Sequence, residues 1–417
     1  MIDYKKAITK IKTNKIKINS EIILSINSIN RVSSSDVYSP SDYPAANNSS
    51  FDGYAINSKE TKSLTKKKFK KFRILKTIAA GDNPKIKKAQ KHSTIEVMTG
   101  AIIQKPYDAV IPIEQIKFYP KKNKYKYIIV DQKINKNDYI RFEGSDFKKN
   151  EKVINKGEII KPQHILALKA LGIKKILVKK KPSIVFYTTG NEISNNEKIP
   201  KWKVRNSNGY YINSFLNSLP IIFKEKKILK DHDKSKFKKE IKNFLSSDSE
   251  LIITSGAISA GKFDFVPQII KQFKIKELFK SVAMRPGKPV MFAKFNKNKS
   301  FFGLPGNPIS SAACFRFLVL PFLFYSLGVK NDIFINAKIK NKFVKKKKFT
   351  RFIKGRIYFS KKGTVEFQIL KGQESYKISP FVNSNAWGLF PSGKAIFKKG
   401  EYIKCFTHSG TNELFIS

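Results

Sequence analysis

Four short loops of this 417-residue chain combine a stiff backbone with side chains that could bind an anion. In Leu304-Pro305-Gly306-Asn307-Pro308, two prolines around a Gly-Asn pair force a non-helical loop before a long apolar segment. Exposed backbone N–H groups at such a helix start favour a negatively charged ligand. The other loops are residues 50–55, 254–261 and 285–289. Together the four loops predict a site for a small, phosphorylated, anionic ligand.

The charged residues of these loops indicate how such a ligand could be held. Arg285 and Lys288 flank a Pro-Gly pair, so two cations project from a stiff turn that can clamp an oxyanion. Glu192 follows a predicted strand end, where a carboxylate is well placed for a metal ion or a ligand, although a solvated surface position is the alternative. Asp52 precedes a glycine, so taken alone it is more simply explained as a turn cap.

Residues 256–262 match most of a nucleotide-binding P-loop, G-x-x-x-x-G-K. The next residue is Phe263, so the hydroxyl that would hold magnesium is missing, and Asp264 stands one place further on. The pattern therefore favours a glycine-rich turn whose N–H groups hold a phosphate while Asp264 holds a metal ion or orients water. Ser255 and Ser259 on the same loop weaken the alternative of an empty turn.

The predicted secondary structure places these loops. Residues 181–330 alternate strands and helices, which predicts a doubly wound parallel α/β domain with ligands at the carboxyl ends of its strands. Residues 45–145 and 331–417 are short apolar runs cut by turns, which predicts a small β-rich domain and a second β domain. Helices are expected in residues 1–44 and 146–180.

Net charge is +52, from 83 Lys and Arg against 31 Asp and Glu, and would ordinarily indicate a nucleic-acid or membrane partner. The lysines are spread along the whole chain with Ile, Asn and Phe, however, so a general compositional bias explains them and no specific nucleic acid or membrane is expected. The apolar run at 317–328 contains Pro321 and follows Arg316, which favours a buried helix.

Cys314 and Cys405 are the only cysteines, and the four histidines are scattered. A disulfide framework and a zinc cluster are therefore not expected. The N-terminus lacks the unbroken apolar core of a secretory signal. A reducing, cytoplasmic location is predicted.

Taken in order, these motifs strongly resemble the molybdopterin molybdenumtransferase family, which includes the C-terminal domain of gephyrin. The resemblance covers nearly the whole chain, and its most specific motifs are Asp52-Gly53-Tyr54-Ala55 and Leu304–Pro308. The other matching motifs are Arg31-Val32, Asp36-Val37, Pro40, Pro44, Ala80-Gly81, Met98-Thr99-Gly100-Ala101, Asp108-Ala109-Val110, Gly144-Ser145-Asp146, Thr189-Gly190-Asn191-Glu192, Ser207-Asn208, Thr254-Ser255-Gly256, Gly261, Asp264 and Pro286-Gly287-Lys288-Pro289.

The resemblance implies a homodimeric enzyme with four domains per subunit. It takes adenylylated molybdopterin from a partner adenylyltransferase, cleaves the phosphoanhydride with Mg²⁺, inserts molybdate into the dithiolene and releases AMP. The implied domains are a discontinuous, elongated helical domain (1–44 and 146–180), the small β-rich domain (45–145), a molybdopterin-binding α/β domain (181–330) and a C-terminal β-barrel-like domain (331–417).

The resemblance also assigns roles to individual residues. Glu192 and Asp264 would bind Mg²⁺ or direct water, while Arg285 and Lys288 would neutralise oxyanion charge. Asp52, Thr99, Asp146, Glu192 and Asp264 are the implied catalytic residues, and the first three would reach the α/β domain of the other subunit. The implied substrate-binding residues are Ser255, Gly256, Ser259, Gly261, Arg285, Lys288, Pro305, Asn307, Pro308, Ser310 and, from the last domain, Ser375.

Three positions depart from the family pattern. Arg285 stands where the family commonly has lysine, Lys354 stands where it often has arginine, and the loop 255–261 replaces the usual Ser-Gly-Gly-Val-Ser-Val-Gly. Three alternatives stay open: a molybdopterin-binding scaffold without turnover, a tungstate-inserting variant and a basic nucleic-acid binder. Molybdate and tungstate are tetrahedral dianions of similar size, so the sequence does not separate them.

Overall fold

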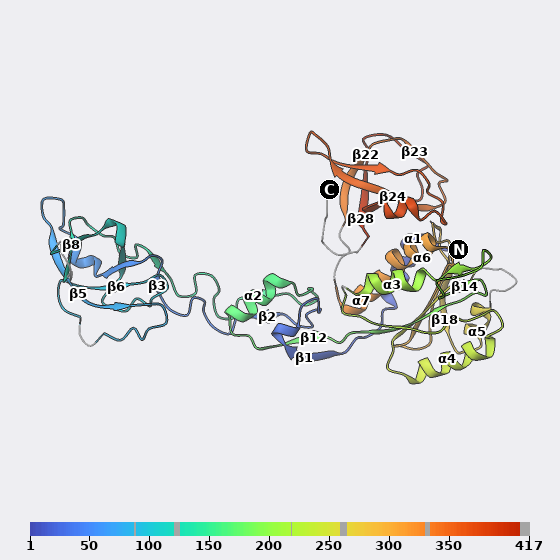
Figure 1. The fold of residues 1–417 in the computed structure, drawn as a ribbon, viewed down its shortest axis with the longest axis horizontal. Coiled ribbons are helices and arrows are strands. Elements are labelled where there is room, and N and C mark those ends of the chain that lie inside the picture. Colours follow the sequence, from blue (N-terminus) through green and yellow to red (C-terminus); the bar gives the residue numbers. More distant parts are fainter. Residues whose placement is uncertain (87–88, 121–125, 218, 259–264, 330–333, 409–417) are drawn as a thin grey trace. The chain divides into compact units, whose positions relative to one another are not determined.

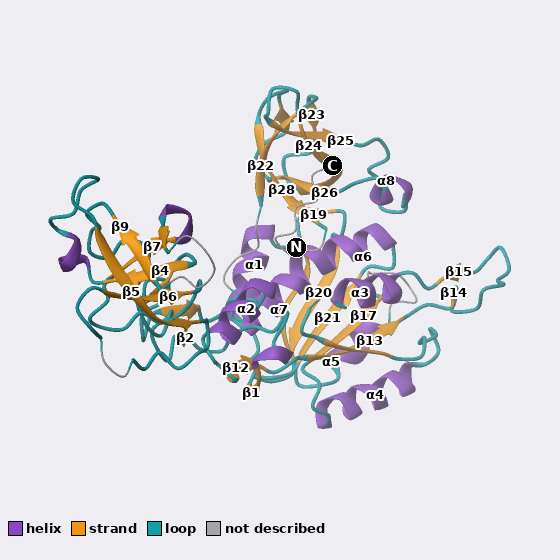
Figure 2. Ribbon diagram, turned by 60° about the vertical axis from the view of Figure 1, so that its left-hand side comes forward, coloured by secondary structure: helices purple, strands orange, loops and turns teal. Residues whose placement is uncertain are grey.

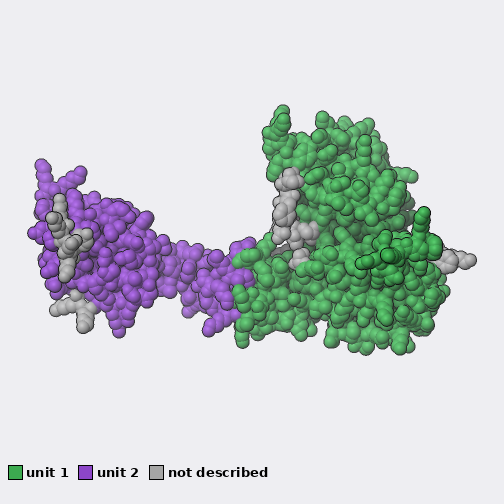
Figure 3. Space-filling model, viewed as in Figure 1, with its two compact units in different colours: residues 1–35, 155–162, 175–417 green, residues 36–154, 163–174 purple. Residues whose placement is uncertain are grey.

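The computed structural model describes residues 1–86, 89–120, 126–217, 219–258, 265–329 and 334–408. They form two compact units, coloured separately in Figure 3. Unit 1 comprises Met1–Ser35, Asn155–Pro162 and Lys175–Ser417, and unit 2 comprises Asp36–Ile154 and Gln163–Lys174. Many elements of both units are labelled in Figure 1.

A six-stranded sheet forms the centre of the α/β domain, in the order β16-β13-β17-β21-β20-β18. The pairs β16·β13, β13·β17 and β17·β21 are parallel, as predicted, whereas β20 runs antiparallel to both of its neighbours. Only residues 295–299 join β20 to β21, and so short a connection cannot make the crossover that parallel strands need. The strands are β13 (Ser183–Thr188), β16 (Ile222–Glu225), β17 (Leu251–Ser255), β18 (Lys276–Ser281), β20 (Pro289–Lys294) and β21 (Ser300–Leu304).

Helices cover both faces of this sheet, as Figure 2 shows, so the doubly wound prediction is confirmed. Ile184 and Phe186 of β13 join the core under α3, α6 and α7, while Val185 and Tyr187 join the core under α4 and α5. This alternation follows from the two-residue period of a strand. The helices are α3 (Asn208–Leu216), α4 (Lys234–Ser246), α5 (Val266–Lys271), α6 (Pro308–Cys314), the π-helical turn η4 (Phe315–Val319) and α7 (Leu320–Leu327).

The continuous helical stretch Pro308–Leu327 is a core helix. It is long and apolar enough to cross a membrane by length and composition, but 89% of its apolar window is buried inside the protein. It ends at Gly328, whose φ of +84° is a left-handed conformation that suits glycine. The prediction of a buried helix is confirmed.

The C-terminal region of unit 1 is a closed barrel. Its sheet runs β19-β24-β25-β22-β28-β26, and the additional pairing of β24 with β26 closes five of these strands into a ring. The first strand of the sheet, β19, comes from the α/β domain and pairs in parallel with β24. The elements are β19 (Met284–Arg285), β22 (Ile335–Ile339), β23 (Phe343–Val344), β24 (Thr350–Phe359), β25 (Val365–Ile369), α8 (Ser379–Val382), β26 (Ala386–Phe390), β27 (Ile396–Phe397) and β28 (Tyr402–Thr407).

The segments predicted as helical contain strands as well. Helices α1 (Tyr4–Thr13) and α2 (Pro162–Ala170) are present, but β1 (Ser20–Leu24) pairs with β12 (Lys175–Lys179). In β12 burial alternates from one residue to the next, a two-residue period that the helical interpretation overlooked. Helix α1 packs through Ala7 into the same core as the α/β domain.

Unit 2 is β-rich, as predicted for residues 45–145. Its main sheet runs β7-β4-β6-β5-β9-β8, with separate cores that include Tyr54 and Ala55. Successive residues of β4 therefore face opposite sides of the sheet. The elements are β2 (Val37–Tyr38), β3 (Asn48–Ser49), β4 (Gly53–Ile56), β5 (Lys70–Ile78), β6 (Ser93–Val97), β7 (Ala109–Pro112), β8 (Lys117–Tyr119), β9 (Tyr127–Val130), β10 (Ile140–Arg141) and β11 (Lys152–Ile154).

Candidate active site

Two neighbouring cavities lie where β21 ends and β20 begins, and they share Pro289, Pro305 and Asn307. We name them by their charged residues. The cationic pocket, of about 550 Å³, is lined by Arg285, Pro286, Gly287, Lys288, Pro289, Pro305, Asn307, Ser310, Arg351, Gln373, Glu374 and Ser375. The carboxylate pocket, of about 440 Å³, is lined by Thr189, Gly190, Glu192, Asp231, Gly256, Ala257, Ile258, Pro289, Pro305, Gly306 and Asn307.

Two arginines lie side by side in the cationic pocket. Arg285 of β19 is in register with Arg351 of β24. Burial lowers the pKa of Arg351, and the positive charge of Arg285 lowers it further. Arg285 also lies over the ring of Phe349, 4.5 Å from its centroid, and the buried Nε of Arg351 has no hydrogen-bond partner within the described part of the chain. Two adjacent guanidiniums with a spare donor favour an anionic ligand.

The turn that carries Arg285 and Lys288 rests on helix α6. A Cβ at Gly287 would lie 2.4 Å from Sγ of Cys314, and this glycine has a φ of +98°. The Cys314 thiol donates to the Gly287 carbonyl at 3.3 Å, and burial raises the pKa of this thiol, so it stays protonated. The sequence Pro-Gly-Lys-Pro therefore requires its glycine for close packing as well as for the turn.

Ser375 comes to this pocket from the barrel domain. Its carbonyl accepts from the backbone N–H of Ile309 at 3.2 Å, and its Oγ accepts from Nδ2 of Asn307 at 3.3 Å. Asn307 is the N-cap residue of α6 but makes no side-chain hydrogen bond to that helix. The barrel loop thus supplies part of the cap, and it joins the predicted residues Pro305 and Ser310 along one wall.

In the carboxylate pocket, the backbone requires Gly256. Its φ is +100°, and a Cβ there would lie 2.6 Å from the carbonyl oxygen of Thr189. The N–H of Gly256 donates to Leu304 O, and the N–H of Thr189 donates to Ser255 O, each at 2.9 Å. Because any side chain at position 256 would meet backbone atoms, glycine allows the two strand-end loops to touch.

Two carboxylates, Glu192 and Asp231, line this pocket. Thr189 forms an isolated parallel bridge with Leu229, and the N–H of Asp231 donates to Oδ1 of Asn191 at 3.0 Å. Sequence reasoning found Glu192 but missed Asp231. The available signal was weak, because Asp231 lies two residues after Leu229, which pairs with Thr189 only through an isolated bridge.

The described residues contain no group of three or more His, Cys, Asp or Glu side chains that could hold a metal ion. Mg²⁺ needs fewer protein ligands, because it usually keeps several waters and is bound through one or two carboxylates together with substrate phosphates. Glu192 and Asp231 are the carboxylates that line this pocket in the described part of the chain, so they are the side chains that such an ion could use.

Ser255 was predicted to bind substrate, but it lies behind both pockets. It is 1% exposed and lines neither of them. Its Oγ accepts from Nδ2 of Asn208 at 2.7 Å and donates to Pro305 O at 3.2 Å. Asn208 also donates to Gly306 O at 2.9 Å. These two side chains hold the loop that begins at Pro305, and Pro308 is the first residue of the helix after it.

Comparison with known proteins decides the family. The MoeA N-terminal region (domain I and II) matches residues 2–172, a probable molybdopterin binding domain matches 186–325, and the MoeA C-terminal region (domain IV) matches 336–406. Proteins of Staphylococcus aureus (strain Mu50) and Staphylococcus epidermidis (strain ATCC 12228), each named molybdopterin molybdenumtransferase, are 29% identical over 407 and 410 residues. Each alignment covers 96% of this chain and 94% of the relative.

This chain belongs to the molybdopterin molybdenumtransferase family.

The fold agrees with this molybdopterin molybdenumtransferase assignment. The crystal structure of the molybdopterin biosynthesis moeA protein from Pyrococcus horikoshii OT3 has a TM-score of 0.82 at 24% identity, covering 97% of this chain and 99% of that one. In the present transferase, all lining residues of the carboxylate pocket lie in the region matched to molybdopterin binding. The region matched to domain IV supplies Arg351 and Ser375 of the cationic pocket.

Three predicted site residues of this transferase lie in unit 2. Oδ1 of Asp52 accepts from the backbone N–H of Thr99 at 2.6 Å and from its Oγ1 at 2.9 Å. These hydrogen bonds, the backbone one first, lower the pKa of Asp52. Asp146 is exposed in the same unit, and its N–H donates to Tyr43 O at 3.0 Å. A Cβ at Gly53 would lie 2.1 Å from the carbonyl oxygen of Ile111, so the Asp-Gly motif requires its glycine for strand pairing.

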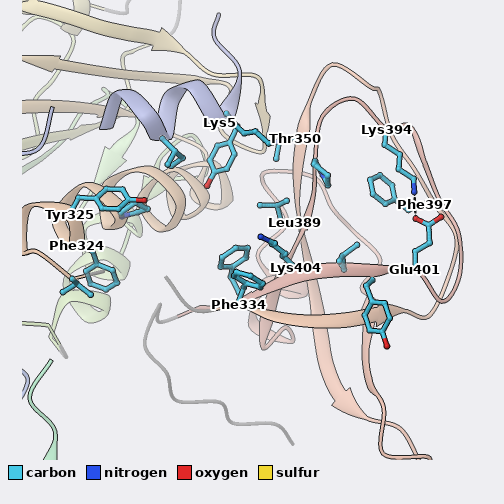
Figure 4. A pocket seen from close by; sticks show the side chains of 18 residues that line it. Lys5, Phe324, Tyr325, Phe334, Thr350, Leu389, Lys394, Phe397, Glu401 and Lys404 are labelled. Carbon is cyan, nitrogen blue, oxygen red and sulfur yellow. Dashed lines mark hydrogen bonds and ion pairs between the residues drawn. The ribbon is translucent and has the colours of Figure 1, made fainter. Parts of the chain in front are cut away.

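The predicted residues Ser259, Gly261 and Asp264 lie outside the described residues. A larger cavity of about 770 Å³, shown in Figure 4, lies between helices α1 and α7 and the barrel. Aromatic residues such as Phe324 and Phe334 line it, and it contains none of the predicted site residues. In this transferase, size alone therefore does not locate the candidate active site.

Proposed function

We propose that this protein inserts molybdate into adenylylated molybdopterin, with Mg²⁺-dependent cleavage of the phosphoanhydride and release of AMP. One observation carries the proposal: two cavities of opposite charge share a wall formed by Pro289, Pro305 and Asn307. A tetrahedral oxyanion suits the cationic pocket, and a metal-bound phosphate suits the carboxylate pocket. Both ligands would then meet at the shared wall, where the reacting groups must approach each other.

Arg285, Lys288 and Arg351 bind the oxyanion in this proposal. Their charges offset the repulsion between a dianion and the thiolates that it approaches. The two guanidiniums offer paired N–H donors, whereas Lys288 acts as a point charge. The hydroxyl of Ser375 lies on the same wall and adds a neutral hydrogen-bonding group.

Glu192 and Asp231 would hold the Mg²⁺ ion, which when bound neutralises charge on the phosphoanhydride. Hydrogen bonds from the backbone N–H groups of Thr189 and Asp231 hold the loops that carry these two carboxylates. Loops held in this way favour ligands that need little rearrangement as charge develops. Asp264 remains a predicted metal ligand from outside the described residues.

The remaining assignments are part of the same proposal. Asp52, Thr99 and Asp146 act at the active site of the other subunit of a homodimer, an adenylyltransferase supplies the substrate, and the enzyme is cytoplasmic. The Asp52–Thr99 hydrogen bonds hold this exposed carboxylate in one orientation, as the proposed role requires.

The test is AMP release by the purified protein supplied with adenylylated molybdopterin, Mg²⁺ and molybdate, followed by chromatography. We expect release to require Mg²⁺ and to yield a product containing molybdenum. Binding of the pterin without any AMP release would contradict the proposal and support a scaffold. Offering molybdate and tungstate together, with metal analysis of the product, distinguishes the two oxyanions.

A further inference from the structure

A buried lysine lies beside the cationic pocket without lining it. Lys354, on β24 three residues after Arg351, is 1% exposed. Its Nζ donates to the carbonyl of Glu374 at 3.2 Å and to the carbonyl of Lys377 at 3.0 Å. Burial lowers the pKa of Lys354, and the nearby carboxylate of Glu374 opposes that effect. Burying a cation costs free energy unless it is hydrogen-bonded. The two hydrogen bonds therefore indicate that the Lys354 ammonium is held by this one turn.

The backbone of the same residue holds the start of this loop. The N–H of Lys354 donates to Oε1 of Gln373 at 3.0 Å, and Nε2 of Gln373 donates back to Lys354 O at 2.9 Å. Nε2 of Gln373 also donates to Leu370 O at 2.7 Å. Lys354 therefore fixes both sides of residues 373–377, through its backbone on one side and its ammonium on the other.

The opposite side of the loop forms the wall of the pocket. Ser375, between the two carbonyls that Lys354 binds, contacts Ile309 N and Asn307 Nδ2 at the start of α6. Gln373 and Glu374 line the same pocket. A continuous path of hydrogen bonds thus leads from Lys354 through the turn to the residues that close the cationic pocket.

We propose that Lys354 is a positioning residue for the oxyanion: its ammonium holds the turn at 374–377 so that Ser375 stays against Asn307 and the cationic pocket keeps its shape. The inference rests on the proposed function. It does not require Lys354 to touch the oxyanion. An arginine could make the same two hydrogen bonds to carbonyls, whereas a methionine of similar length could make neither.

The experiment measures molybdate binding by calorimetry for the full-length protein and for Lys354→Met, Lys354→Arg, Ser375→Ala and the double variant Lys354→Met/Ser375→Ala. We expect Lys354→Met to weaken binding about tenfold and Lys354→Arg to restore it to within about threefold. The double variant should bind about as weakly as Lys354→Met alone, because residues acting through one path are not additive. Lys371→Met is the matched control, since Lys371 is exposed on the same loop and should leave binding unchanged.

Hydrogen exchange of residues 372–377 provides a second readout that does not depend on molybdate. We expect faster exchange in Lys354→Met and unaltered exchange in Lys371→Met. Equal molybdate affinity in Lys354→Met and the unaltered protein would overturn this inference alone, as would faster exchange without weaker binding. Failure of the unaltered protein to bind molybdate would overturn the proposed function as well.

Discussion

The cationic and carboxylate pockets share a wall but are assembled differently. The carboxylate pocket is built within the α/β domain, from loops at the ends of neighbouring strands. The cationic pocket also needs the barrel, which contributes Arg351 and the loop at 373–375. The metal and phosphate end of the proposed site is therefore a property of one domain, while the oxyanion end depends on the docking of two.

This difference predicts separable defects. Changes in the carboxylate pocket should affect cleavage of the phosphoanhydride, whereas changes on the barrel side should affect oxyanion affinity. Four measurements test the two pockets and the loops that carry their residues.

Removing a carboxylate should have the largest effect. We expect Glu192→Gln or Asp231→Asn to lower the rate of Mg²⁺-dependent AMP release about 100-fold, because the developing charge loses its counter-charge. Molybdate affinity should stay within about twofold, since the cationic pocket is intact. Glu197→Gln is the control, an exposed carboxylate in the same connection, and should have the activity of the unaltered protein. An equal loss of AMP release in Glu197→Gln would contradict a specific role for the two carboxylates, and an equal loss of molybdate affinity in Glu192→Gln or Asp231→Asn would contradict separate pockets.

Removing a barrel cation should come next. We expect Arg351→Met to weaken molybdate binding about 30-fold, the size of a lost charge-assisted hydrogen bond, in a calorimetric titration. Its AMP release should keep the Mg²⁺ dependence of the unaltered protein. Arg356→Met changes an exposed arginine of the same strand and should bind molybdate normally. Unchanged affinity in Arg351→Met would show that the barrel is not needed at the oxyanion end.

Two glycines with similar φ angles distinguish the effect of steric crowding around a new Cβ from the effect of backbone strain. Gly256 has a φ of +100° and backbone atoms within reach of a Cβ, whereas Gly393 has a φ of +90° and nothing within 4 Å. We expect Gly256→Ala to lower the free energy of unfolding by about 2 kcal/mol, and Gly393→Ala by at least about 1 kcal/mol less, in urea unfolding. Equal losses would mean that the contact between the Thr189 and Gly256 loops is not what requires glycine.

The smallest effect concerns Asp52, whose Oδ1 accepts two hydrogen bonds from Thr99. Thr99→Ala removes one donor, so the pKa of Asp52 should rise toward its ordinary value in an NMR titration, while Thr99→Ser should preserve it. Because the folded-state pKa is depressed, this contribution to stability is present above the unfolded pKa and disappears as pH falls through the folded pKa. An unchanged pKa in Thr99→Ala would assign the whole effect to the backbone N–H.

Much of the site was predictable because it follows from local rules. The loops after β17 and β21 and the turn at 285–289 do meet, since the carboxyl ends of parallel strands share one edge of a sheet. Gly256 and Gly287 were recognisable as turn glycines, and both have positive φ. Ser375 was placed only by family resemblance, and the structure puts it on the wall beside Asn307.

Other residues were not predictable in this way. Arg351 sits in an ordinary β-strand of a second domain, and its position beside Arg285 arises from the register of β19 with β24. Asp231 follows a segment that pairs with Thr189 only through an isolated bridge, so the sequence gives little sign of a strand before it. Ser255 carries a hydroxyl in a glycine-rich loop, but this residue is buried and its hydroxyl donates a hydrogen bond to the carbonyl of Pro305.

Residue type and short-range spacing were enough to predict the alternation of strands and helices, the glycines and prolines that shape each loop, and the family. The folded structure was needed to show that Arg351 and residues 373–375 line a pocket with residues of the α/β domain, and that Lys354 donates to the carbonyl of Glu374. Pairing between β19 and β24 joins residues 66 positions apart in the chain, such as Met284 and Thr350, and no local propensity encodes such a register.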